Sequence, residues 1–248
     1  MTQVFRLLLL NFKGILFYFK SFIILSQQKG KDLNFPFGRF LPIFWQRFSQ
    51  SGKMSGHYFH QDLHVAKRIY INNPEKHLDI GSRIDGFISH LAVFRKVEVL
   101  DIRNLDSKIN NIVFKQADLM QSQVSLYDYC DSISSLHAIE HFGLGRYGDR
   151  VDYLGHIKAL KNIAKILKKG GVFYFSVPIG LQRIEFNAHR VFSLSYLIQI
   201  LEEDFDIVDF SFVDDKGDLN INISLNQKDI IRNYGCNYGC GIFELIKK

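Results

Sequence analysis

The sequence is poor in cysteine and proline. Among its 248 residues are three cysteines, four prolines and a single tryptophan. Three thiols (Cys130, Cys236 and Cys240) are too few for a disulfide framework, so we expect reduced cysteines in a cytoplasmic protein. Cys236 and Cys240 are four residues apart, and no nearby Cys/His pair completes a zinc motif. We therefore predict no metal site.

The chain also lacks an apolar run long enough to cross a bilayer. Residues 1–25 are rich in Leu, Phe and Ile, but Arg6, Lys13 and Lys20 interrupt them. The uncharged runs are shorter than the roughly 20 residues that a spanning helix needs. No small-residue cleavage site follows, which argues against a secretory signal.

The three cations of this segment recur every seven residues, so a helix would carry them on one stripe. Such a helix can lie in the membrane interface, where its cations meet anionic headgroups. That interpretation places the protein peripherally at the inner face of the membrane. Packing of the segment on its own domain or on a second subunit is the alternative. The sequence sets no oligomeric state.

The net charge is +6 at pH 7, which suits an anionic partner such as a nucleotide-linked substrate or an acidic membrane. A surplus of solvated lysines is the alternative explanation. The chain has no long Lys/Arg run and no interleaved aromatic and basic motif. We therefore predict no nucleic-acid partner.

Strand and helix patterns alternate after an N-terminal arm. We assign residues 1–56 to an apolar, amphipathic arm and residues 57–248 to one domain. The expected strands are 77–80, 97–102, 111–114, 132–136, 172–177, 205–213 and a segment within 219–225 or 241–246. The expected helices are 58–71, 84–93, 151–167 and 193–203. This order predicts an α/β, Rossmann-like fold with a mostly parallel sheet, an antiparallel edge strand and helices on both faces.

Acidic residues and glycine follow the first three expected strands. Asp79 and Gly81 come at the end of the first strand, where a glycine lets backbone approach a ligand. Asp101 ends the second strand, about 20 residues after that loop, where an acid can bind ribose hydroxyls. Asp118 follows the third strand and is placed to accept a hydrogen bond from an adenine amino group. In this order the three acids indicate a nucleoside site beyond the carboxyl ends of the strands.

Five segments resemble the motif series of class I S-adenosylmethionine-dependent methyltransferases: HLDIG, VEVLDI, QADL, SLHAIEH and LKKGGVFYFSVP. The resemblance covers roughly residues 76–177 and implies an S-adenosylmethionine cofactor. The residues that it implies are Asp79, Gly81 and Ser82 at the methionine end, Asp101 at the ribose, Asp118 at the adenine, and Leu136, with the segment up to His141, at the methyl donor.

The glycine-rich loop departs from the usual pattern. Arg83 stands where a second glycine is expected, and Gly86 follows later in the loop. The departure puts cofactor affinity and orientation in question, and a non-catalytic, membrane-associated scaffold that keeps the fold is one alternative. A nicotinamide-dependent sugar-modifying enzyme is another, although the chain lacks the G-x-G-x-x-G run of that class.

Four further segments resemble a bacterial family of methyltransferase-like proteins known only as a domain of unknown function: SGHYFHQD, IEHFGLGRYGD, RIEFNAHRVFS and YGCGIFELIK. Members of that family are often associated with surface-polysaccharide genes. The resemblance implies a glycan or other small-molecule acceptor, namely O-methylation of a sugar or nucleotide-activated sugar.

Two polar segments, residues 140–149 and 185–190, follow strands and are expected to converge over the cofactor. Methyl transfer needs the acceptor in line with the sulfonium methyl, and a hydroxyl acceptor also needs a base. We expect His189 or His141 to be that base, since histidine titrates near neutrality. The candidate substrate-binding residues are Arg146, Asp149, Glu185, Asn187 and Arg190, with the arginines binding a phosphate or carboxylate.

Overall fold

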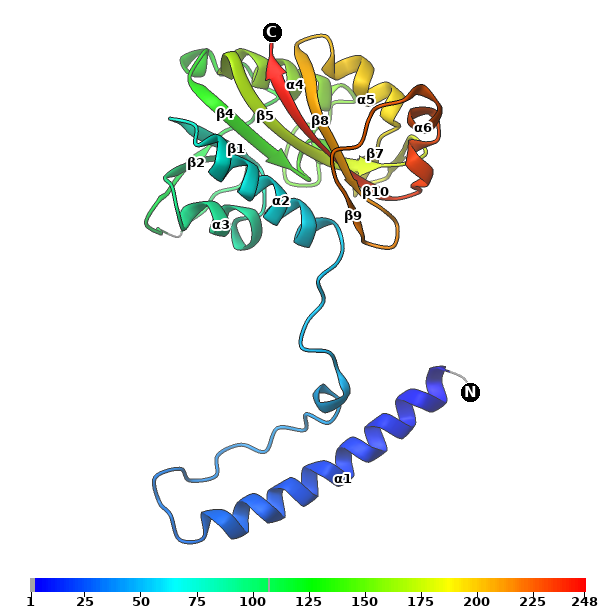
Figure 1. The fold of residues 1–248 in the computed structure, drawn as a ribbon. Coiled ribbons are helices and arrows are strands. Elements are labelled where there is room, and N and C mark those ends of the chain that lie inside the picture. The colour runs from blue at the N-terminus through cyan, green and yellow to red at the C-terminus, as the bar shows by residue number, and fades with distance from the viewer. Residues whose placement is uncertain (1–2, 107) are drawn as a thin grey trace. The chain divides into compact units, whose positions relative to one another are not determined.

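The computed structural model describes residues 3–106 and 108–248 and divides the chain into two compact units, Met1–Met54 and Ser55–Lys248 (Figure 1). The first unit consists of one long helix and a returning segment, and the second holds the sheet. Met1 and Thr2 of the predicted arm, and the side chain of Arg6, lie outside what is described. None of the described helices is long and apolar enough to cross a membrane.

Helix α1 (Gln3–Lys29) packs along one side against the returning segment, which ends in a short 3₁₀ turn, η1 (Gln46–Phe48). Gly14 allows this approach, because a Cβ there would lie 2.3 Å from the carbonyl oxygen of Phe44. One and two helical turns later, Tyr18 packs edge-on against Phe44 and Phe22 packs on Phe37, with ring centroids 5.4 and 5.2 Å apart. Small and aromatic residues four apart thus give the helix one packed face.

The second unit is built on an eight-stranded sheet of order β3-β2-β1-β4-β5-β10-β8-β9. The strands are β1 (His77–Ile80), β2 (Val97–Asp101), β3 (Ile112–Gln116), β4 (Cys130–Leu136), β5 (Leu167–Ile179), β8 (Phe205–Val213), β9 (Leu219–Asn220) and β10 (Gly239–Lys247). The first five strands in this spatial order, β3, β2, β1, β4 and β5, are mutually parallel. The predicted mostly parallel α/β fold is confirmed.

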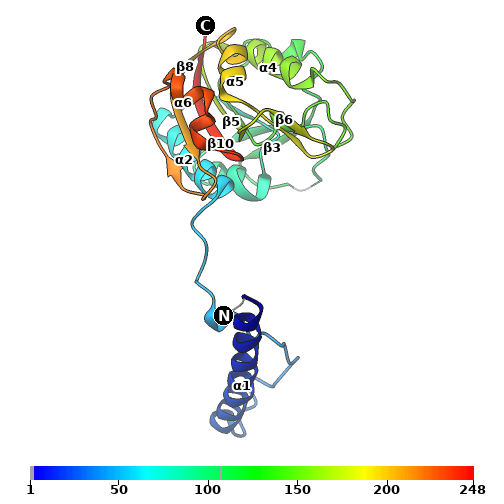
Figure 2. The same ribbon diagram turned by 90° about the vertical axis from the view of Figure 1, so that its right-hand side faces the viewer.

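Helices cover both faces of the sheet (Figure 2). On one face lie α2 (His57–Asn72), the π-helical turn η2 (Ile84–Ile88) and α3 (Ser89–Ala92), and on the other lie α4 (Gly155–Ile166) and α5 (Leu194–Leu201). Side chains alternate between the two clusters along β5, where Tyr174 faces α2 while Phe173 and Phe175 face α4 and α5. This alternation makes two apolar layers and fixes the register of the sheet.

The predicted antiparallel edge strand is confirmed by β9, which pairs antiparallel with β8 at one edge of the sheet. Both candidate segments near the end of the chain form strands, β9 and β10, and β10 lies inside the sheet between β5 and β8 rather than at its edge. Strand β5, predicted to end at residue 177, also continues through Pro178, which lies opposite Cys240 of β10. Pairing with β10 along its whole length lets β5 extend beyond the proline.

Two short connections were predicted differently. The polar segment 185–190, expected as a connection after a strand, belongs to a hairpin of β6 (Arg183–Glu185) and β7 (His189–Val191). Helix α4 begins at Gly155, four residues later than predicted, because the main chain around Asp152 is bonded to the 143–149 loop instead. The remaining short helical elements are η3 (Val124–Leu126), η4 (Ile139–His141), α6 (Gln227–Ile231) and η5 (Asn233–Gly235).

Candidate functional site

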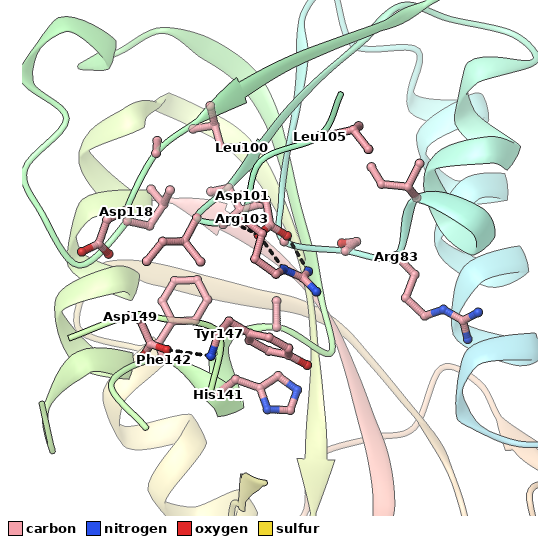
Figure 3. Close-up of a pocket in the computed structure, with 18 of the residues that line it drawn as sticks. Arg83, Leu100, Asp101, Arg103, Leu105, Asp118, His141, Phe142, Tyr147 and Asp149 are labelled. Atoms are coloured by element: carbon pink, nitrogen blue, oxygen red, sulfur yellow. Dashed lines mark hydrogen bonds and ion pairs between the residues drawn. The ribbon is translucent and has the colours of Figure 1, made fainter. Parts of the chain in front are cut away.

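A cavity of about 440 Å³ opens beyond the carboxyl ends of β1 and β2 (Figure 3). Gly81 makes the turn out of β1 with φ +72°, and a Cβ there would lie 3.0 Å from the Cβ of Ala138. The turn is held by a hydrogen bond from the Gly81 amide to the Leu100 carbonyl, 2.9 Å. The polar residues of the wall are Tyr58, Ser82, Arg83, Asp85, Asp101, Arg103, Asn104, Asp118, His137, His141, Tyr147 and Asp149. The loops that were expected to hold a nucleoside, after β1, β2 and β3, therefore border one cavity.

Asp79 lies beneath this wall and does not line it. Its carboxylate is fully buried and accepts hydrogen bonds from the Ser82 amide (3.0 Å), the Ser82 hydroxyl (2.6 Å) and the Ser134 hydroxyl (2.5 Å). Burial raises the pKa of Asp79 to about 7, although these hydrogen bonds oppose the shift. Ser82 also accepts from the amide of Leu136, which is buried behind the wall. Asp79 and Leu136 hold the loop after β1 in place through Ser82. Gly81 and Ser82 themselves line the cavity.

Asp101 lines the cavity but already has a partner. Arg103, two residues later, donates from Nε to Oδ1 (3.0 Å) and from Nη2 to Oδ2 (2.7 Å), as Figure 3 shows. The guanidinium also stacks on Tyr147, 4.4 Å from the ring centroid. Asp101 holds the pKa of Arg103 above its usual value. A ligand that uses Asp101 must share this carboxylate with Arg103 or displace it.

Asp118 forms the opposite end of the cavity, beside Phe114 and Ala117. Its Oδ1 accepts from the Met120 amide at 2.9 Å, which fixes the side chain in the turn after β3. The other carboxylate oxygen has no hydrogen bond from the described residues. The apolar neighbours and this oxygen suit a flat ring with an amino group.

Arg83, which replaces the second glycine, extends away from Asp101 and Asp118 in Figure 3. It forms an ion pair with Asp85 (Nη2 to Oδ2, 3.1 Å), and its guanidinium lies 4.8 Å from the ring centroid of Tyr58. The pair is largely exposed. The larger side chain therefore leaves the cavity open.

The 140–149 segment forms a wall of the cavity, and Asp149 holds it together. The Asp149 carboxylate accepts from the amides of Gly143 (2.8 Å), Gly145 (3.2 Å) and Tyr147 (3.2 Å). Arg146, an exposed residue, donates instead to the Ala188 carbonyl at 3.0 Å. Asp149 lines the cavity, and its carboxylate oxygens accept hydrogen bonds from the loop itself.

His141 is the predicted base that lines the cavity. Its Nδ1 donates to the Ala188 carbonyl at 2.6 Å, so the neutral ring carries its lone pair on Nε2. Burial lowers the pKa of His141, and the carboxylate of Glu140, 3.7 Å from Nε2, opposes that shift. The ring is therefore neutral at neutral pH, as a base requires.

The other predicted base, His189, lies behind His141, with ring centroids 6.3 Å apart, and does not line the cavity. Burial lowers the pKa of His189, and its Nε2 is buried with no partner among the described residues. Glu185 pairs with Arg183 at 2.6 Å, and Asn187 adopts φ +56° at the hairpin turn. These two exposed residues shape the hairpin and lie outside the cavity wall.

Arg190 is buried and holds backbone. It donates to the carbonyls of Glu140 (3.4 Å), Phe142 (2.6 Å) and Tyr153 (3.1 Å), all in the segment that borders the cavity. The structure thus differs from the expectation that Arg190 binds an acidic group of the acceptor, because its donors are directed at these carbonyls. The guanidinium positions the 140–153 segment.

His137 was not among the predicted site residues. It follows β4 with φ +51°, lines the cavity and places Nδ1 2.8 Å from Glu140 Oε1. Burial works against the charged ring, but Cys240 and Glu140 raise the pKa of His137 well above its usual value. Arg103 and Tyr147 were missed as well. The sequence signals for these residues were that His137 lies in the SLHAIEH motif, that Tyr147 lies in the GLGRYGD motif and that Arg103 is two residues after Asp101.

The fold is shared with solved methyltransferases at low sequence identity. The N-methyltransferase NodS from Bradyrhizobium japonicum, solved with S-adenosylhomocysteine, has a TM-score of 0.50 and 16% identity over 82% of this chain and 91% of its own. The 1,6-didemethyltoxoflavin N1-methyltransferase from Burkholderia thailandensis, also solved with S-adenosylhomocysteine, gives 0.54 and 12% over 93% and 88%. The cyclase SpnF gives 0.55 and 12% over 76% and 80%.

No curated protein matches the sequence. The profile of the family described as Caenorhabditis protein of unknown function, DUF268, matches residues 84–235. This span includes the IEHFGLGRYGD and EFNAHR segments, and it covers more than half of the chain. The protein therefore belongs to the DUF268 family.

Proposed function

We propose that the protein is an S-adenosylmethionine-dependent methyltransferase. The observation that carries this proposal is the cavity at the ends of β1 to β3, where Gly81, Asp101 and Asp118 lie in the order that an adenosyl cofactor requires. The methionine end would meet Gly81 and Ser82, the ribose Asp101 and the adenine Asp118. The likeness to two methyltransferases solved with S-adenosylhomocysteine supports the same cofactor. When bound, the cofactor supplies the methyl group as a sulfonium.

The acceptor in this proposal is a hydroxyl of a sugar or nucleotide-activated sugar. His141 lines the cavity with a free Nε2 lone pair and can take the hydroxyl proton. Arg146 is exposed at the same loop and can meet an acidic group on the acceptor. The resemblance to proteins associated with surface-polysaccharide genes supports a glycan.

Binding of the cofactor is tested first by thermal unfolding of the purified chain with S-adenosylmethionine, S-adenosylhomocysteine, NAD or no ligand. A ligand at a concentration 100 times its dissociation constant adds about 2.7 kcal/mol to the free energy of unfolding, which raises the melting temperature by several degrees. We expect a shift with both adenosyl sulfur compounds and none with NAD. A shift with NAD alone would favour the nicotinamide-dependent alternative.

A second candidate is a binding protein or scaffold that keeps the fold without methyl transfer. The bidentate pair between Arg103 and Asp101 favours it, because the predicted ribose acceptor is already engaged. The similarity to a cyclase also supports this candidate, because one fold can carry several different functions. Methyl transfer from labelled cofactor to any cell-extract glycan, absent from a His141→Ala variant, would eliminate this candidate.

We also propose that the N-terminal unit contacts an acidic membrane surface. Opposite its packed face, α1 presents four apolar side chains at helical spacing, each more than half exposed: Phe12, Leu16, Phe19 and Ile23. Lys13 and Lys20 each follow a member of this stripe and are exposed beside it. An apolar stripe flanked by cations suits the interface of an anionic bilayer.

Cosedimentation of the full chain with lipid vesicles tests this contact. We expect binding to vesicles that contain phosphatidylserine, weakened at least about tenfold by Phe12→Ser combined with Phe19→Ser, since each buried Phe contributes roughly 1.5–3 kcal/mol. Phe35→Ser is the matched control, because Phe35 is 85% exposed but lies outside the stripe. Self-association without vesicle binding would favour a second subunit as the partner.

A further inference from the structure

Three potential metal ligands meet beside the cavity. One ligand atom each of His57, His137 and Cys240 lies within 4.8 Å of the other two. His57 is the first residue of α2, His137 follows β4 and Cys240 lies on β10, so three distant segments converge. The thiol of Cys240 is fully buried, and His137 is nine-tenths buried. Methyl transfer, as proposed above, uses neither Cys240 nor His57.

The orientation of His137 points to a ligand that the protein itself does not provide. Its Nδ1 is 2.8 Å from Glu140 Oε1, which leaves Nε2 as the atom directed elsewhere. Nε2 is buried and has no hydrogen bond of ordinary geometry from the described residues. A histidine that ligates a metal commonly donates its other ring N–H to a carboxylate, which fixes the tautomer. Glu140 stands in that position.

The neighbouring rings are arranged compatibly. The imidazoles of His57 and His137 are parallel within 6°, with centroids 5.2 Å apart. The Cys240 sulfur makes two long contacts, 3.5 Å to Gln61 Oε1 and 3.8 Å to the Gly241 carbonyl oxygen. A direct contact between the Cys240 thiol and His137, which raises the pKa of His137, is the alternative arrangement without an ion. A single ion between the three side chains satisfies all of them.

We propose that His57, His137 and Cys240 bind a divalent zinc-class ion at the edge of the cavity. A thiolate with two imidazoles is a borderline-soft donor set, which suits zinc and excludes magnesium or calcium. Binding forms metal–sulfur and metal–nitrogen bonds, and it releases to solvent both the thiol proton of Cys240 and the Nε2 proton of the charged His137 ring. Three protein ligands leave a fourth position for water, and His137, which also lines the cavity, connects the ion to the site described above.

Cobalt titration of the full chain tests the site, using protein purified without a metal-binding tag and stripped with a chelator. We expect about one equivalent of Co²⁺ to give a thiolate-to-cobalt charge-transfer band and the d–d spectrum of a tetrahedral ion, and Zn²⁺ to abolish both. Cys240→Ser should lose the charge-transfer band, and His57→Ala should weaken binding. Removal of the supporting carboxylate in Glu140→Gln should lower affinity about tenfold.

Cys236→Ser is the matched control, since Cys236 is equally a buried thiol, four residues before Cys240 and outside the cluster. It should keep the complete cobalt spectrum. The proposal is overturned if unmodified protein gives no charge-transfer band, or if the band survives in Cys240→Ser. Neither readout depends on catalysis, so the site is judged separately from methyltransferase activity.

Discussion

Lowering the pH from 6.5 to about 4.5 is expected to destabilise the protein, because buried histidines take up protons only when the chain unfolds. Burial lowers the pKa of His77 from 6.5 to about 3 and that of His156 to about 4. Stability from such a group is present above its unfolded pKa of 6.5 and is lost as the pH falls toward the folded value. Each histidine contributes a slope of about 1.4 kcal/mol per pH unit.

Asp79 works in the opposite direction. Its folded pKa of about 7 exceeds the ordinary 3.8, so its contribution is complete below pH 3.8 and is lost as the pH rises through 7. The dependence of the free energy of unfolding on pH therefore contains contributions of both signs. Substitution of a single histidine measures the contribution of that residue.

His77→Gln provides this isolation. The ring of His77 is fully buried in β1, with its nitrogens 2.8 Å from the Ser132 hydroxyl and 3.0 Å from the Ser134 hydroxyl. Urea unfolding at several pH values between about 4.5 and 6.5 should show a slope shallower by about 1.4 kcal/mol per pH unit. His90→Gln, at an exposed position, should match the unmodified chain. An unchanged slope in His77→Gln would contradict the assignment.

Replacing Asp101 by Asn is expected to weaken cofactor binding about 10- to 100-fold. Hydrogen bonds from ribose hydroxyls to a carboxylate contribute about 1.5–3 kcal/mol, and the neutral amide provides less. Isothermal titration with S-adenosylhomocysteine measures the change. Equal affinity of both proteins would remove Asp101 from the ribose site.

Two further variants make this comparison sharper. Glu98→Gln removes a carboxylate from the same strand, but Glu98 binds Lys115 and Tyr129 outside the cavity, so affinity should not change. Arg103→Ala frees the Asp101 carboxylate from its bidentate partner and should tighten binding several-fold. Weaker binding in Arg103→Ala would instead make Arg103 a ligand contact.

The parallel half of the sheet could be predicted from local patterns. Short apolar runs such as His77–Ile80 are followed by turns that carry Gly81 or an acid, and parallel strands place all those turns at one edge. The place of β10 within the sheet could not be predicted from local patterns. Its pairing with both β5 and β8 depends on residues about 30 to 70 positions away, and nothing in the segment itself distinguishes an inner strand from an edge.

The candidate site divides along the same line. Gly81, Asp101 and Asp118 reach the cavity because each is tied to a strand end. Arg190 was expected to bind substrate, since a sequence shows a charge but not the carbonyls of Phe142 and Tyr153 that surround it. Cys240 and His57 are 183 residues apart in the sequence, so their proximity is apparent only in the folded structure.

The inner position of β10 also governs how the chain can be made. Ribosomal synthesis delivers the protein from its N-terminus, and β5 and β8 leave the ribosome before residues 239–247. Until then, the edges of β5 and β8 that pair with β10 in the finished sheet lack that partner. The nascent domain is thus open to a foreign strand or a chaperone at one defined place. Pairing of β10 with β5 and β8 covers both edges and at the same time brings Cys240 close to His137.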